Sequence, residues 1–199
     1  MEAKIRQHLY KDPLLKKAIE AVELPNYQPE TTVYGSLLRS IISQQLSVKA
    51  AATIYGRFVD LFETKTPDPA LILAKSAEDL RAVGLSKQKA GYMRNIADFA
   101  QQNDLNKVDW STYTDEEIIS FLTQIKGVGV WTVQMILMFT LQRPDVLPTA
   151  DLGIQQAIQQ LYELDEKGKA LIKKMKEIAA PWSPYQTTAS LYLWRWKDQ

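Results

Sequence analysis

Two glycines stand one residue apart, immediately before an almost wholly apolar segment of the chain. Gly127 and Gly129 occur in "IKGVGVWTVQMI", and Val, Met, Ile, Leu and Phe dominate residues 130–141. Because glycine is unfavourable inside a helix, the pair predicts a tight turn that opens a buried helix. The first N–H groups of that helix have no partner within it, and a phosphate fits them. On the glycines alone, a plain packing turn between two helices is the more common explanation, because short turns that contain glycine are frequent.

Neighbours of this turn could extend a phosphate site. The helix is expected to open at Val130, Lys126 could supply a positive charge, and Thr132 could supply a hydroxyl. Trp131 falls in the first helical turn beside the same site, where an aromatic side chain could also belong to a core. Lys126, Val130 and Thr132 are therefore candidates for contact with an anionic ligand, and Trp131 lies next to them.

A carboxylate stands at the start of a later helical segment. Asp151 follows "LPTA" and precedes residues 152–162, which carry an apolar stripe at helical spacing. The positive end of a helix dipole stabilises a negative charge at this position. Asp151 is therefore either an ordinary N-terminal cap or a functional carboxylate held by the helix start.

The composition excludes several kinds of chemistry. The 199 residues contain no cysteine and a single histidine, His8, which excludes disulfides, cysteine-bound zinc and iron–sulfur clusters, and most histidine-based sites. Any catalysis must use carboxylates, lysines, hydroxyls or backbone groups. With 24 basic and 23 acidic residues the net charge is +1, which neither indicates nor excludes a nucleic-acid partner.

No apolar run is long enough to span a bilayer, and the first residues lack the apolar core of a signal peptide. We therefore expect no membrane partner and a cytoplasmic protein, associated with the nucleoid if the source is bacterial.

Helical periodicity dominates the chain, and no convincing pair of strands is present. The fold class predicted is all-α with short connections. We expect helices over residues 12–22, 33–47, 47–62, 76–84, 86–102, 114–125, 130–142, 151–162, 166–180 and 184–196. Residues 80–93 and 122–135 weakly echo each other as helix, glycine turn and helix.

The motif "GVGVWT", followed about twenty residues later by "LPTAD", resembles the helix-hairpin-helix, Gly/Pro-rich, Asp superfamily of DNA base-excision glycosylases. Within it, the chain is most similar to the 3-methyladenine (alkylpurine) DNA glycosylase II branch. The stretches "YGSLLRSIISQQLSVKAAATIYGRF", "GLSKQKAGYMRNIADFA" and "PWSPYQTTASLYLWRW" extend the similarity, which runs from Tyr34 to Trp196.

The resemblance implies two helical subdomains, with a helix-hairpin-helix motif and a DNA-binding cleft between the subdomains. One is expected over residues 34–143 and the other over 1–33 plus 144–199. Asp151 matches the family's catalytic carboxylate and is expected to project into the cleft. Cleavage of a glycosidic bond develops positive charge on the sugar, which a carboxylate stabilises, or the carboxylate orients the attacking water.

Trp131 occupies the position at which the superfamily's bifunctional members carry a Schiff-base lysine. The resemblance therefore implies a monofunctional enzyme that leaves an abasic site without cutting the strand. An indole can also stack on a cationic alkylated base, an attraction of roughly 0.5–2 kcal/mol. Further base-pocket candidates are Met135, Tyr34, Trp182 and Tyr185, and Met135 replaces an aromatic residue of the Escherichia-type enzyme.

The resemblance also implies how DNA is held. The backbone at Gly127, Gly129 and Val130 would bind phosphate, and Lys87 and Lys89 follow the other glycine turn and could also meet phosphates. The target base must leave the stack, so a side chain must fill the gap. Gln44, Gln45 and Leu46 are the candidates, with Gln45 at the plug position.

Three functions stay open on the sequence. The preferred one is removal of alkylated purines, and the second keeps the fold but changes the damaged base, because Met135 departs from the family pattern. The third is a non-catalytic helix-hairpin-helix module for distorted DNA, which has no need of Asp151 near a sugar. The expected partner is double-stranded DNA with damaged bases, bound by a monomer. The family implies no cofactor and no metal site beyond a monovalent cation at the hairpin backbone carbonyls.

Overall fold

The computed structural model describes residues 2–25 and 32–199, and every regular element within them is helical. The contacts divide the chain into two compact units, each described here by itself. The middle unit comprises residues 30–136, and the terminal unit comprises residues 1–29 and 137–199. The prediction of an all-α fold is confirmed.

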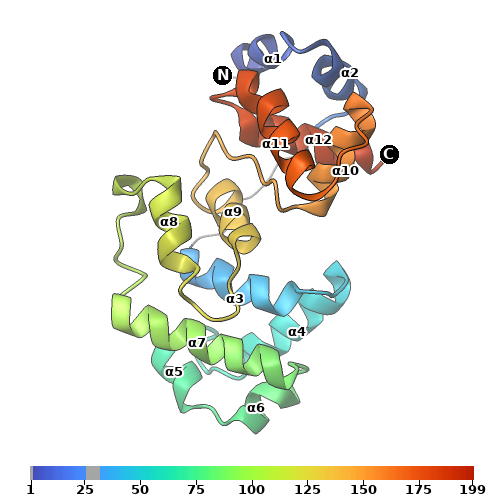
Figure 1. Cartoon of the computed structure of the whole chain (residues 1–199). Coiled ribbons are helices and arrows are strands. Elements are labelled where there is room, and N and C mark those ends of the chain that lie inside the picture. Colours follow the sequence, from blue (N-terminus) through green and yellow to red (C-terminus); the bar gives the residue numbers. More distant parts are fainter. Residues whose placement is uncertain (1, 26–31) are drawn as a thin grey trace. The chain divides into compact units, whose positions relative to one another are not determined.

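The middle unit is built around one long helix, α7 (Lys87–Asn103), which packs against α3, α5 and α6 (Figure 1). Its other helices are α3 (Val33–Ser43), α4 (Val48–Asp60), α5 (Pro69–Ala74), α6 (Ala77–Ala82), α8 (Asp115–Leu122) and the first part of α9 (Val130–Phe139), with a 3-10 turn at Trp110–Thr112. Leu37, Ile41 and Met93 are fully buried where α3 meets α7. This core fixes the two connections that concern function, α3–α4 and α8–α9.

Local sequence signals begin these helices. Ser76 and Thr114 each form a capping box with the acidic residue three positions later, at the starts of α6 and α8. Ser86 caps α7 by accepting a hydrogen bond from the N–H of Lys89 (3.2 Å). Such caps satisfy N–H groups that have no partner within a helix, so they fix where each helix begins.

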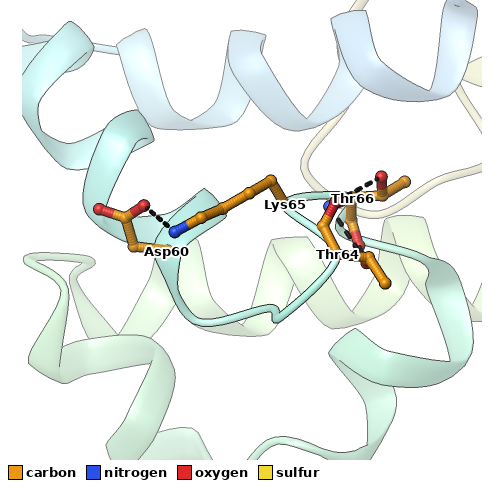
Figure 2. Close-up of polar contacts among 4 residues, drawn as sticks. All are labelled: Asp60, Thr64, Lys65 and Thr66. Atoms are coloured by element: carbon orange, nitrogen blue, oxygen red, sulfur yellow. Dashed lines mark hydrogen bonds and ion pairs between the residues drawn. The ribbon is translucent and has the colours of Figure 1, made fainter.

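The α4–α5 connection is held by its own polar groups. Lys65 has a left-handed backbone (φ 55°), and its ammonium lies 2.7 Å from Asp60 Oδ1. Thr64 and Thr66 exchange side-chain and backbone hydrogen bonds across Lys65 (Figure 2). This exposed ion pair closes the loop that leads into α5.

The terminal unit brings together both ends of the chain. It contains α1 (Glu2–Leu9), α2 (Pro13–Ala21), α10 (Leu152–Tyr162), α11 (Gly168–Ala179), a 3-10 turn at Ala180–Trp182, α12 (Gln186–Lys197) and the end of α9. Asp12 caps α2 through Oδ1, and its Oδ2 accepts hydrogen bonds from the hydroxyl of Tyr162 and from Nε1 of Trp182 (3.0 Å). One carboxylate thus ties α2 to α10 and to the 3-10 turn.

The structure differs from the sequence-based expectation at several points, and most helix ends fall within one to three residues of the expected ones. Helix α1 was not expected, and it is held by burial of Leu9. Helix α3 ends at Ser43 and not at Ser47, because Gln45 adopts a left-handed backbone. The expected junction at 143–144 lies beyond the observed division, which falls inside α9, between residues 136 and 137.

Candidate functional site

The α8–α9 connection is a tight turn with one left-handed glycine. The N–H of Ile125 donates to the carbonyl of Leu122 (3.2 Å), and the N–H of Val128 donates to the carbonyl of Ile125 (2.9 Å). Gly127 has φ +105°, a conformation that residues with a side chain rarely adopt. Gly129 does not have a positive φ, so only the first of the two glycines serves the backbone in that way.

Helix α7 presses against this turn and leaves no room for a side chain on Gly127. A Cβ on Gly127 would lie 2.4 Å from the ring of Tyr92. Asn95, one helical turn further along α7, donates from Nδ2 to the carbonyl of Lys126 (3.1 Å). Tyr92 and Asn95 thus fix the turn on its inner side.

The outer side of the turn is open. A Cβ on Gly129 would meet no atom within 4 Å, and the first hydrogen bond within α9 runs from Val133 N–H to the Gly129 carbonyl (3.2 Å). The N–H groups of Val130, Trp131 and Thr132 precede that bond, and Gly129 has no side chain with which to cap them. The start of α9 therefore has open space beside Gly129, and phosphate binding there stays a prediction.

The side chains at this helix start divide into two groups. Val130 and Trp131 are 46% and 41% exposed, and Lys126 is exposed as well. Thr132 is only 3% exposed, so its hydroxyl is not presented to a ligand, and the prediction that this hydroxyl binds phosphate is wrong. Thr132 lies on the side of α9 that faces the core, which explains why it is buried.

Asp151 caps α10 and is oriented by an indole. Its Oδ1 accepts hydrogen bonds from the N–H of Ile154 (2.9 Å) and from Nε1 of Trp194 on α12 (2.8 Å). The Asp151 N–H bonds to the carbonyl of Pro148 (2.9 Å), which closes the turn before the helix. Both of these side-chain hydrogen bonds reach the same carboxylate oxygen.

Two further residues shape the surroundings of Asp151. A Cβ on Gly153 would lie 3.0 Å from Asp151 Oδ1 and 3.1 Å from Nε1 of Trp194, so the glycine makes room for that hydrogen bond. Phe139 stacks on Trp194 with an interplanar angle of 21° and a centroid distance of 6.1 Å. The carboxylate is half-buried and fixed in orientation, which suits it to stabilise a cation or to orient a water.

The α3–α4 connection, residues 44–47, is here named the Gln45 loop. Gln45 is exposed with φ +57°, and Leu46 beside it is exposed. Val48, the first residue of α4, is 88% exposed. The middle unit therefore presents a short loop with a polar tip beside two uncovered apolar side chains.

Three other predicted site residues are engaged in contacts within the protein: Tyr34 and Trp182 are buried, and Lys89 is half-buried. Tyr34 is 6% exposed, its hydroxyl donates to the Pro67 carbonyl (2.9 Å), and burial raises its pKa. Trp182 is 1% exposed and hydrogen-bonded to Asp12. Lys89 donates to the carbonyls of Ile42 and Gln44, so its charge is committed to the protein. These contacts argue against Tyr34 and Trp182 as pocket walls and against Lys89 as a phosphate ligand.

The remaining predicted residues keep some accessible surface. Lys87 is exposed at the start of α7, and Gln44 is half-buried. Met135 on α9 and Tyr185 are half-buried too, and the Tyr185 ring contacts His8 edge to face at 5.3 Å. These residues stay candidates.

Sequence reasoning missed the residues that support the site. Trp194, Tyr92, Asn95 and Gly153 were given no role in the sequence analysis. Gly153, two residues after Asp151 in "ADLG", was a usable signal, because a glycine in the first turn of a helix is unfavourable without a packing reason. No local pattern marked Trp194 as the partner of a residue 43 positions away.

Within residues 2–25 and 32–199, no cluster of three or more His, Cys, Asp or Glu residues could hold a metal ion. No helix in that part of the chain is long and apolar enough to cross a membrane.

At the turn between α8 and α9, the carbonyl of Ile125 accepts a hydrogen bond from the N–H of Val128, and the carbonyl of Lys126 accepts one from Nδ2 of Asn95.

Comparison with known proteins places this geometry in a family. The profile of the HhH-GPD superfamily of base excision DNA repair proteins matches residues 38–184. A Bacillus subtilis relative, provisionally named a DNA-3-methyladenine glycosylase, is 38% identical over 170 residues, which are 82% of this chain and 58% of the relative. DNA-3-methyladenine glycosylase 1 of Schizosaccharomyces pombe is 36% identical over 178 residues, 85% of this chain and 77% of that protein.

The fold agrees as well. The structure of the Schizosaccharomyces pombe 3-methyladenine DNA glycosylase Mag1 in complex with abasic DNA superposes with a TM-score of 0.80 at 35% identity, covering 96% of this chain and 95% of that one. The profile spans most of the chain and includes the hairpin turn, Trp131 and Asp151. The chain belongs to the HhH-GPD superfamily of base excision DNA repair proteins.

Proposed function

We propose that this protein is a monofunctional DNA glycosylase that removes alkylated purines of the 3-methyladenine and 7-methylguanine type and leaves an abasic site. The observation that carries the proposal is the fixed orientation of Asp151 by the start of α10 and by the indole of Trp194. The names of the two relatives support the substrate class, although the chain spans only 58% of the Bacillus subtilis relative's length.

The chemistry is hydrolysis of an N-glycosidic bond. The bond between the sugar C1′ and the base nitrogen breaks with its electron pair moving to the base. Water adds to C1′ and releases a proton to solvent, so the products are the free base and an abasic sugar. Asp151 stabilises the positive charge that develops on the sugar and orients the water. An alkylated purine that is already cationic leaves as a neutral molecule, so a strong general acid is less necessary.

Trp131 is the candidate for contact with the base. Its exposed indole can stack on a base that has left the duplex, and a cationic base strengthens that stacking by roughly 0.5–2 kcal/mol. An indole cannot form a Schiff base with an abasic sugar, so Trp131 supplies no strand-cutting step. Met135, one helical turn later, and Tyr185 are secondary candidates for the pocket.

Phosphates are the proposed ligands of the α9 start. The N–H groups that follow Gly129, with Lys126 beside them, bind one phosphate of the damaged strand. Lys87 is exposed and can meet another phosphate. Gln45 fills the gap left by the extruded base, with Leu46 beside it.

The proposal includes no resident cofactor other than a monovalent cation at the carbonyl oxygens of the hairpin turn. We further propose that the protein acts on duplex DNA as a monomer. It is expected in the cytoplasm, associated with the nucleoid if the source is bacterial.

The test is a panel of duplexes that each hold one modified base. The free base is measured by chromatography, and strand breaks are measured before and after alkali. We expect release of 3-methyladenine or 7-methylguanine and breaks only after alkali. Release of hypoxanthine, 8-oxoguanine or uracil alone would show a glycosylase for other damaged bases. Binding without release of any base would instead show a DNA-binding module, and breaks before alkali would overturn the role given to Trp131.

A further inference from the structure

Lys89 reaches from α7 to the end of α3. Its ammonium donates to the carbonyl of Ile42 (2.9 Å) and to that of Gln44 (2.7 Å), two residues that lie 47 and 45 positions earlier in the chain. The last carbonyls of a helix have no partner within the helix, and a cation there also meets the negative end of the helix dipole. Lys89 thus closes the C-terminus of α3 from a neighbouring helix.

The two carbonyls lie at the base of the Gln45 loop. The Gln44 carbonyl belongs to the peptide that joins Gln44 to Gln45, so its hydrogen bond sets the orientation of the peptide just before the left-handed residue. On the other side, the N–H of Leu46 bonds to the carbonyl of Ser43 (3.1 Å). A left-handed conformation is unfavourable for glutamine and persists only where its surroundings hold it.

A second cation on α7 makes the same kind of contact elsewhere. Arg94 donates from Nη1 to the carbonyl of Leu73 (3.2 Å) and to that of Lys75 (2.7 Å), at the end of α5. The segment after α5 leads directly into the Ser76 cap of α6. Arg94 and Lys89 therefore make the same kind of contact, each donating to two carbonyls at the C-terminus of a neighbouring helix. Of the two, Lys89 contacts the helix that leads into the Gln45 loop.

We propose that Lys89 is a positioning residue for base extrusion, which holds the Gln45 loop in the conformation that lets Gln45 enter the duplex. This inference rests on the proposed function, because it requires Gln45 to fill the gap left by the base. Two of the three ammonium donors of Lys89 are used inside the protein, so the residue acts through the loop and not through a phosphate.

The test compares Lys89→Met with Arg94→Met and with Lys89→Arg. The first readout is the fluorescence of 2-aminopurine placed next to a 7-methylguanine, which rises when the neighbouring stack opens. We expect Lys89→Met to slow this rise at least tenfold. Arg94→Met is expected to leave it within about twofold of the native rate, and Lys89→Arg to restore most of it, since a guanidinium can also donate to two carbonyls.

Two further readouts separate positioning from other roles. A phosphate ligand contributes to the salt dependence of binding to undamaged duplex, so its loss lowers the slope of log K against log salt by about one. Lys89→Met should leave that slope unchanged. In a Gln45→Ala background, Lys89→Met should add no further loss of the fluorescence rate, because both changes act on the same step.

The inference is overturned by a slope lowered by about one, by losses that multiply in the double variant, or by equal effects of Lys89→Met and Arg94→Met. If Lys89→Met melts at a lower temperature than Arg94→Met, Lys89→Gln is judged by the same criteria, since its amide can still donate to one carbonyl. Native protein that releases no base from the same duplex overturns the proposed function and this inference together. Native activity with unchanged Lys89→Met fluorescence overturns the inference alone.

Discussion

The indole of Trp194 donates a hydrogen bond from Nε1 to Oδ1 of Asp151 over 2.8 Å, linking α12 to the first turn of α10. The backbone N–H of Ile154 reaches the same oxygen at 2.9 Å. Two donors from different elements therefore fix the carboxylate plane, and Gly153 leaves the space in which they meet. Preorganised orientation of this kind lets a charged group act on a transition state without rearranging first.

Trp194→Phe removes one of these donors and keeps an aromatic ring against Phe139. We expect base excision to slow about tenfold, which corresponds to the loss of one hydrogen bond to a charged group worth roughly 1.5 kcal/mol. The KM for DNA should change little, because Trp194 is proposed to act through Asp151. Single-turnover and steady-state kinetics with melting curves measure these quantities, and an unchanged excision rate would contradict a positioning role for Trp194.

Gly127→Ala should destabilise the fold. The substitution combines a left-handed φ of +105° with a Cβ that would lie 2.4 Å from the Tyr92 ring. We expect a loss of roughly 2–4 kcal/mol in the free energy of unfolding, measured by denaturant titration. Gly129→Ala is the matched control, because its Cβ meets nothing within 4 Å. It should unfold like the native protein but bind DNA several-fold more weakly, since the methyl group crowds the phosphate. Equal stability of the two variants would show that the turn can shift away from Tyr92.

Trp131→Ala should weaken action on cationic bases in particular. Loss of the cation–π contact predicts excision of 7-methylguanine slowed roughly 3- to 30-fold, with Trp131→Phe affected less. Because the indole is already exposed, both variants should melt close to the native temperature. The measurement is the excision rate of the native protein and of both variants on matched duplexes. If alanine and phenylalanine give the same rate, stacking on the base is not the role of Trp131.

The start of α8 predicts a pH dependence of stability. Backbone and side-chain hydrogen bonds from Thr114 lower the pKa of Glu117. A carboxyl whose pKa is lowered by folding stabilises the protein above its unfolded pKa, and this contribution is lost as the pH falls through the folded pKa. Glu117→Gln should therefore melt below the native protein at neutral pH and together with it at about pH 2. A difference in melting temperature that persists in acid would point to a role of Glu117 other than its charge.

Local signals in the sequence predicted much of the fold. The expected helices at residues 12–22, 76–84 and 114–125 are present, and each begins where Asp12, Ser76 or Thr114 accepts a capping hydrogen bond. The glycine turn before α9 and Asp151 at the start of α10 were found in the same way. These features depend on neighbours within a few residues, which a sequence displays directly.

Contacts between distant residues could not be predicted in this way. Lys89 looked like a surface cation, and its commitment to Ile42 and Gln44 depends on how α7 packs against α3. Tyr34 was expected in a pocket, but the rotation of α3 turns its hydroxyl to the Pro67 carbonyl. Helical periodicity identifies a buried face without identifying which neighbour covers it.

The most direct test of the whole account is base release by Asp151→Asn from duplex DNA carrying one 7-methylguanine. Asparagine keeps an oxygen that can accept from Ile154 N–H and Trp194 Nε1, so the fold should persist while the negative charge is lost. We predict release slowed by about 10²- to 10³-fold or more, with undiminished binding to abasic DNA. Release within about threefold of the native rate, well short of that expected loss, would contradict the catalytic role of Asp151.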